Sequence, residues 1–155
     1  MLTENNEIIL TERIKDLFKT ANGKYIAPQA IEIKLQEDKY IDQVAVIADK
    51  RKYVSALIVP DFEQLHDYAA RHSISYVDNK DLIANPEIVT LIANRIEYQI
   101  IDFASFEKVK RFTLLPEPFS METGELTNTL KIRRKVIEER YKDIIDSMYD
   151  DSIPD

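Results

Sequence analysis

The sequence predicts an α+β domain: a small mixed sheet of about three strands flanked by helices, with an N-terminal β-hairpin as an appendage. Three apolar runs have the length of strands and lie at residues 41–47, 53–59 and 109–115. The second run is apolar on both faces, as expected for a central buried strand. Apolar residues recur at helical spacing over residues 28–38, 62–72, 86–106 and 133–148. Strands and helices are therefore interleaved, without an internal repeat.

The N-terminal region carries the signals of a hairpin. Short apolar runs on either side of a charged segment predict a hairpin over residues 8–19. The pair Asn22-Gly23 is the strongest short turn signal in the chain, and Tyr25-Ile26 forms another short strand after it.

Several helix starts are marked by residues that cap or open a helix. Pro28 occupies a first helical position. Asp61 and Gln64 have the spacing of a capping box. Asn85 stands before a proline and an acid, which predicts the start of the longest helix. The polar segment at residues 73–80 predicts a connector without regular structure.

The composition restricts the classes of function. The chain has 155 residues, of which 45% are hydrophobic and 32% charged, which is ordinary for one soluble domain. A net charge of −7 argues against nucleic acid as the main partner. The chain lacks cysteine, and His66 and His72 are off the spacing that would bring two ligands together, so we predict no metal site. No run has membrane-spanning length and no secretory signal is present, so we expect a cytoplasmic protein.

The stretch from Gly124 to Arg134 concentrates groups that bind anions. Thr127 and Thr129, with the amide between them, can donate hydrogen bonds to an anion, and Lys131 supplies a flexible point charge. The alternative is a solvated polar loop that leads into a basic helix start. The chain has only two glycines and no glycine-rich phosphate loop, so it carries no nucleotide cradle of its own.

Two segments resemble motifs of one enzyme family. Residues 12–32, with the core Lys-Asp-Leu-Phe-Lys and then Gly-Lys-Tyr-Ile-Ala-Pro, resemble the start of the C-terminal domain of AMP-forming acyl-CoA synthetases. Residues 106–115 and 124–131 resemble the final segment of the long-chain fatty acid branch of that family. The similarity runs in order from residue 8 to 149. One departure is Glu12, where the family often has glycine or aspartate.

The resemblance implies a role for the loop. Family members join a carboxylate to ATP as an acyl-adenylate and then pass the acyl group to coenzyme A. Lys131 matches the lysine that acts from the C-terminal domain during adenylation, where an ammonium offsets the repulsion between two anions. Arg13, Thr127 and Thr129 are expected to support it.

The resemblance also implies a rotation of the domain between the two steps. Lys15 matches the hinge about which the domain turns. Lys19 and Gly23 match the face that is presented to coenzyme A in the thioester-forming state. There, Gly23 would let the backbone pass close to the pantetheine.

On this basis residues 1–15 are the end of an interdomain region with the hinge, and residues 16–155 are a mobile C-terminal domain. The family's N-terminal catalytic domain, with its phosphate loop and fatty-acid tunnel, is absent from this sequence, so we predict that the chain alone is inactive. The full-length enzyme would use ATP, Mg²⁺, coenzyme A and a fatty acid, and associate peripherally with membranes. The isolated domain would hold no cofactor, and its partner would be the N-terminal domain of the same polypeptide.

Two alternatives stay open from the sequence. The first is a non-catalytic partner-binding module of the same fold. The second is an acyl-adenylating relative with another acceptor, such as a carrier protein.

Overall fold

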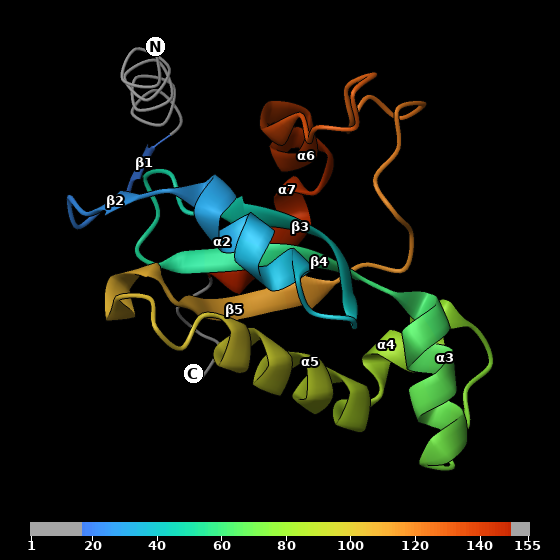
Figure 1. Ribbon diagram of the computed structural model, residues 1–155. Helices are drawn as coiled ribbons and strands as arrows, with labels where there is room; N and C mark the ends of the chain where they lie inside the picture. Colours follow the sequence, from blue (N-terminus) through green and yellow to red (C-terminus); the bar gives the residue numbers. More distant parts are fainter. Residues whose placement is uncertain (1–16, 150–155) are drawn as a thin grey trace, which may run out of the picture.

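The computed structural model describes residues 17–149 and has a central sheet with helices on both of its faces (Figure 1). The elements are β1 (Phe18–Lys19), β2 (Tyr25–Ile26), α2 (Pro28–Gln36), β3 (Ile41–Ile47), β4 (Val54–Pro60), α3 (Phe62–Arg71), α4 (Asn79–Ala84), α5 (Pro86–Gln99), η1 (Ser105–Glu107), β5 (Val109–Leu114), α6 (Arg134–Arg140) and α7 (Lys142–Met148). This architecture confirms the predicted α+β class with its N-terminal hairpin.

The main sheet has three strands in the order β3-β4-β5. Strands β3 and β4 are antiparallel, with Val44 opposite Ile58, whereas β4 and β5 are parallel. A parallel pair needs a long crossover, and α3, α4 and α5 provide it here. All of β4 is buried, so the prediction of a central strand is confirmed.

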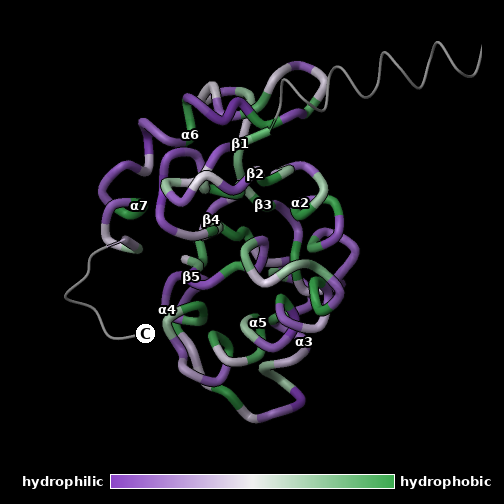
Figure 2. Tube along the Cα trace, turned by 90° about the vertical axis from the view of Figure 1, so that its left-hand side faces the viewer, coloured by the Kyte–Doolittle hydropathy of each residue, from purple (hydrophilic) through white to green (hydrophobic). Residues whose placement is uncertain are grey.

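Alternate residues of the sheet point into two separate cores. Val44, Val46 and Ile58 pack with α2, α3, α4 and α5 on one face. Leu57 and Val59 face the other side, where they pack with α6 and α7. Figure 2 shows the hydrophobic stretches of β4 and α5 toward the middle of the molecule. Burial on both faces explains why the strand run at 54–59 has no polar alternation.

The hairpin in the described part of the chain lies across the predicted Asn22-Gly23 turn. Strand β1 pairs with β2 across the Asn22-Gly23 turn, with Phe18 opposite Ile26. The predicted pairing partner at residues 8–10 lies outside the described residues. A short connection has a lower loop-closure cost, and the glycine adopts the positive φ of 81° that the turn requires.

Three predicted boundaries were wrong. Residues 73–80 include the start of α4, because the Asp78 carboxylate accepts the Asp81 N–H at 2.8 Å and so caps a helix. Helix α5 ends at Gln99, and η1 follows as a separate turn. The last helix is divided at Tyr141, whose φ of −108° and ψ of 24° are not helical. Its ring lies against Phe119, and this tertiary contact accompanies the break.

Within residues 17–149, no helix is both long enough and apolar enough to cross a bilayer. The same part of the chain contains no cluster of three or more histidine, aspartate or glutamate side chains that could hold a metal ion. His66 Nε2 lies 2.7 Å from Asn79 Oδ1, and His72 Nδ1 lies 2.9 Å from the Tyr68 carbonyl oxygen.

Candidate functional site

The loop that carries Lys131, defined here as residues 124–133 and called the Lys131 loop, is closed by its own backbone. Leu126 and Ile132 form an antiparallel bridge. The Thr127 N–H donates to the Lys131 carbonyl at 2.8 Å, and the Leu130 N–H donates to the Thr127 carbonyl at 2.9 Å. Residues 127–131 therefore form a tight turn, and Lys131 is the last residue in it.

The hydroxyl of Thr127 accepts hydrogen bonds from the backbone of this turn and so stabilises it. Its Oγ1 accepts the Thr129 N–H at 3.3 Å and the Lys131 N–H at 3.2 Å. It also lies 2.9 Å from Thr129 Oγ1. The two threonines predicted to support Lys131 are thus brought together with it, and Thr127 contacts its backbone. In contrast, the Lys131 side chain is exposed.

The N-terminal end of the Lys131 loop is held by a carboxylate that the sequence did not single out. Glu125 is only 1% exposed. Its Oε1 accepts hydrogen bonds from the Thr123 hydroxyl and, at 3.3 Å, from the Ser120 N–H. Its Oε2 lies 3.4 Å from Arg140 Nε. Burial, and then the hydrogen bond with Glu125, raises the pKa of the Tyr141 hydroxyl.

The C-terminal end of the loop is held by a second buried carboxylate. Arg134 is the first residue of α6 and forms a two-pronged ion pair with Glu32 of α2, at 2.5 and 3.1 Å. Within the loop, the Arg133 N–H donates to the Glu125 carbonyl at 2.7 Å. Glu32 and Arg134 are distant in sequence, so no local pattern pairs them. The one signal in the sequence was that Glu32, an acidic residue, occupies a position of α2 that is buried.

A groove of about 420 Å³ separates the Lys131 loop from α2. Gln29, Ile33 and Gln36 line it on the helix side, and Leu130 and Lys131 line it on the loop side. Ile33 and Leu130 are both more than half exposed, at 63% and 66%. The Lys131 loop thus presents a cation beside an accessible apolar rim.

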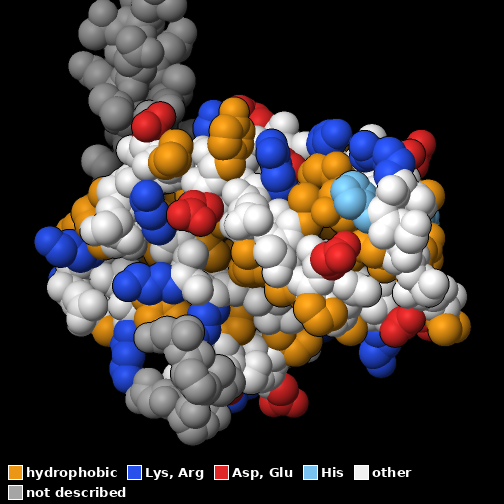
Figure 3. Space-filling view, turned by 90° about the horizontal axis from the view of Figure 1, so that it is seen from below, with side chains coloured by type: hydrophobic (Ala, Val, Ile, Leu, Met, Phe, Trp, Pro, Cys, Tyr) orange, Lys and Arg blue, Asp and Glu red, His pale blue; other side chains and the backbone are white. Residues whose placement is uncertain are grey.

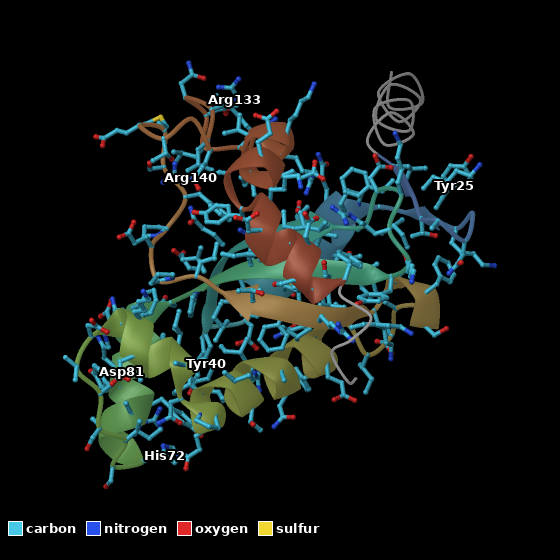
Figure 4. The ribbon with its side chains drawn as sticks, turned by 180° about the vertical axis from the view of Figure 1, so that it is seen from behind. Tyr25, Tyr40, His72, Asp81, Arg133 and Arg140 are labelled. Atoms are coloured by element: carbon cyan, nitrogen blue, oxygen red, sulfur yellow. The ribbon has the colours of Figure 1, made fainter. Side chains whose placement is uncertain are left out.

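The predicted thioester-state residues lie on the hairpin. Figure 4 labels Tyr25 on the hairpin at the opposite side of the view from Arg133 and Arg140, which lie at the end that holds the Lys131 loop. Lys19 is exposed, and its Nζ lies 5.8 Å from the centroid of the Tyr25 ring. A Cβ added to Gly23 would meet nothing within 4 Å, so the glycine is required here by its φ of +81°.

The hairpin packs on the turn between β3 and β4. The Ala21 N–H donates to the Arg51 carbonyl at 2.8 Å, and the Lys50 N–H donates to the Lys19 carbonyl at 2.8 Å. Asn22 Nδ2 donates to the Lys52 carbonyl at 3.3 Å. These bonds make the hairpin a fixed part of the sheet's end.

A basic groove of about 210 Å³ lies beside the hairpin. Its lining includes Thr20, Asn22, Lys24, Lys52, Tyr53, Ser105, Phe106 and Lys110. The Lys24 ammonium lies 5.6 Å from the centroid of the Phe106 ring. Figure 3 shows basic side chains gathered at the left-hand end, where the hairpin and η1 lie in Figure 1. Lysines beside an aromatic ring suit a ligand that carries phosphate and a planar group.

Two of the predicted site residues, Arg13 and Lys15, lie outside the described residues. The structure therefore brings Lys131, Thr127 and Thr129 together in one loop and places Lys19 and Gly23 in another region.

Sequence comparison finds a known family over most of the chain. Residues 15–153 match the family model described as the AMP-binding enzyme C-terminal domain. The chain is 31% identical to the long-chain-fatty-acid–CoA ligase FadD15 of Mycobacterium tuberculosis over 147 residues, which is 94% of this chain and 24% of that protein. It is 33% identical to long-chain-fatty-acid–CoA ligase 5 of Rattus norvegicus over 149 residues, 94% of this chain and 22% of the relative.

Solved structures share the fold. The adenylation domain of a carboxylate reductase from Mycobacterium chelonae superposes with a TM-score of 0.70 at 24% identity, over 88% of this chain and 20% of that one. A Mycobacterium tuberculosis fatty acyl CoA synthetase superposes with a TM-score of 0.51 at 19% identity, over 85% and 21% of the two chains. The sequence thus spans less than a quarter of the length of FadD15 and of the rat ligase. The chain belongs to the AMP-binding enzyme C-terminal domain family, and its relatives include long-chain fatty acid–CoA ligases.

Proposed function

We propose that this chain is the mobile C-terminal domain of a long-chain fatty acid–CoA ligase. The main support for the proposal is that Lys131 combines a fixed backbone with a side chain that is unpaired within the described residues. Its backbone is held in a tight turn, and its ammonium makes no hydrogen bond or ion pair with any residue between 17 and 149. A cation that is exposed on an ordered loop is available for a substrate on another domain.

In the first half-reaction, a carboxylate oxygen of the fatty acid attacks the α-phosphorus of ATP. The bond to pyrophosphate breaks, and acyl-AMP forms. Two anionic groups approach one another in this step, so an ammonium placed between them lowers the barrier. We assign this role to Lys131 and a supporting role to Thr127 and Thr129, which shape its turn; Arg13 is a further supporting candidate. ATP, Mg²⁺ and the acid would bind to the N-terminal domain.

In the second half-reaction, the thiol of coenzyme A attacks the acyl carbonyl, and AMP leaves. We propose that the domain then turns about Lys15, so that the hairpin with Lys19 and Gly23 replaces the Lys131 loop at the substrates. The hairpin and the Lys131 loop are separate segments of the domain surface, so a rotation of the domain could present one in place of the other. The basic groove beside the hairpin suits the phosphates of coenzyme A.

The division of the chain follows from these roles. Residues 1–15 would contain the hinge, and residues 16–155 would turn as one body.

The names of the curated relatives favour coenzyme A over a carrier protein as the acceptor. The same relatives disfavour a non-catalytic binding module.

The test is to assay each half-reaction separately on two proteins: this chain alone, and this chain joined to its N-terminal domain. With palmitate, ATP and Mg²⁺, the joined protein should release pyrophosphate and then form palmitoyl-CoA when coenzyme A is added. This chain alone should do neither. Turnover by the isolated chain, or a joined protein that activates no fatty acid, would contradict the proposal.

A further inference from the structure

The guanidinium of Arg134 connects three elements of the fold. It binds both carboxylate oxygens of Glu32, at 2.5 and 3.1 Å, and donates to the Val46 carbonyl at 3.2 Å. Its central carbon lies 5.1 Å from the centroid of the Phe18 ring in β1. One side chain of α6 therefore contacts α2, β3 and the hairpin.

Glu32 completes this junction from the other side. Its Oε2 also accepts the Val46 N–H at 2.8 Å, which fixes the carboxylate against the sheet. The Glu32 side chain is 9% exposed and that of Arg134 is 18% exposed, so water screens the pair weakly. A planar guanidinium with two parallel bonds defines a direction as well as a distance.

The Lys131 loop needs such a support. Its tight turn is held together by bonds within residues 127–131, and its base is closed by the bond from the Arg133 N–H to the Glu125 carbonyl. Those bonds make the loop stiff internally, but they do not set its angle to the sheet. Arg134 follows the base directly and is held on α2 and β3. Leu126 and Ile132 pack in the core beside α6 and α7, and the ion pair adds a directional polar contact at the C-terminal end of the loop.

We infer that Glu32 and Arg134 are positioning residues for Lys131 in the adenylation half-reaction. This inference rests on the proposed function, because it needs Lys131 to act on a substrate. Neither side chain has to touch that substrate. Their effect is to hold the Lys131 ammonium at one place relative to the body of the domain.

The simpler explanation is that the pair only stabilises the fold, and the chain offers a matched control. Asp38 and Arg95 form a second ion pair, at 2.6 Å, between the segment after α2 and helix α5. The Asp38 side chain is fully buried, and it also accepts a bond from Gln99 at 3.0 Å. Asp38 is bound by the Tyr40 N–H, Arg95 and Gln99, none of which lies on α6 or in the Lys131 loop.

The experiment compares Glu32→Gln with Asp38→Asn in the chain joined to its N-terminal domain. Both changes keep the shape of the side chain and remove one charge from a buried pair, so both should lower the melting temperature. Glu32→Gln should reduce kcat of adenylation by about 100-fold, since a displacement of about 1 Å can have an effect of that size. The KM values for ATP and palmitate, and thioester formation from supplied palmitoyl-AMP, should not change. Asp38→Asn should leave both half-reactions unchanged.

Equal effects of the two variants on adenylation would overturn the inference, and so would an equal loss of both half-reactions in Glu32→Gln. If Glu32→Gln does not fold, Arg134→Lys provides the same comparison, because lysine keeps the charge but not the two parallel bonds. A Lys131→Ala variant distinguishes failure of the proposed function from failure of the positioning role. If Lys131→Ala adenylates normally, the proposed function fails. If Lys131→Ala loses adenylation while Glu32→Gln adenylates normally, only the positioning role fails.

Discussion

The hairpin and the Lys131 loop each contain a tight turn and a positive-φ glycine, but they are attached to the domain in different ways. Backbone hydrogen bonds to the neighbouring turn hold the hairpin, such as that from the Ala21 N–H to the Arg51 carbonyl. Side-chain ion pairs at Glu125 and at Arg134 hold the two ends of the Lys131 loop.

The two regions should therefore differ in their sensitivity to substitution. A backbone hydrogen bond survives almost any change of side chain, so the orientation of the hairpin depends on few particular residues. The Lys131 loop depends on two buried carboxylates, and removal of either leaves a cation without its partner. Single substitutions should therefore act selectively on adenylation.

Lys131→Ala should have the largest effect. In the joined protein it should lower kcat of adenylation by about 10²–10³-fold, the usual result of removing one group that stabilises transition-state charge. Thioester formation from supplied palmitoyl-AMP should continue. Pyrophosphate release measures the first step, and consumption of free thiol measures the second. The control is Lys135→Ala, which removes an exposed lysine of α6, outside the Lys131 loop. A matching loss in both steps would refute a role restricted to adenylation.

Lys15→Pro should abolish the exchange between the two regions. Proline restricts φ to about −65°, so a hinge at this position would be trapped in one orientation. One half-reaction should then fall strongly while the other continues, measured with the same two assays. The hinge assignment is wrong if both steps run at the wild-type rate.

Gly23→Ala should have a moderate effect on the hairpin. An alanine at φ of +81° is strained and should lower the free energy of unfolding by about 1 kcal/mol, measured by urea denaturation. No clash adds to this, because the space around the Cβ position is open. Gly23→Asn should recover part of the stability, since asparagine tolerates this conformation better.

The same pair of variants tests the approach of coenzyme A. If the pantetheine passes close to Gly23, thioester formation should be impaired in both variants while adenylation is spared. Full recovery of thioester formation in Gly23→Asn would mean that the glycine serves only the turn.

The smallest expected effect is on acid stability. Burial by itself raises the pKa of Asp38, but hydrogen bonds from Gln99, the Tyr40 N–H and Arg95 outweigh it and lower the pKa below its ordinary value of 3.8. Because the folded pKa is the lower one, this contribution to stability is complete above pH 3.8 and is lost as the pH falls through the folded value. Denaturation midpoints between pH 5 and pH 3 should therefore depend less on pH in Asp38→Asn than in the wild type. An unchanged slope would contradict this assignment.

Most of the fold could be predicted, because its signals are local. The apolar run of β4 and the proline at the start of α2 indicate their elements within a few residues. The errors have two causes, a local capping signal at Asp78 that was not recognised and a tertiary contact at Tyr141. Tyr141 leaves the helical conformation where its ring contacts Phe119 of another segment.

The α+β class, the buried central strand and the family were evident from the sequence, since apolar runs and motifs depend on neighbouring residues. The sequence also indicated Lys131 as the candidate cation. How Lys131 is held depends on the tertiary structure. Glu32 and Arg134 are separated by 102 positions, and a pairing over that distance leaves no periodic signal in either segment. The direction of the Lys131 loop is thus a property of the packed domain, because Glu32 meets Arg134 only after α2, the sheet and α6 have assembled.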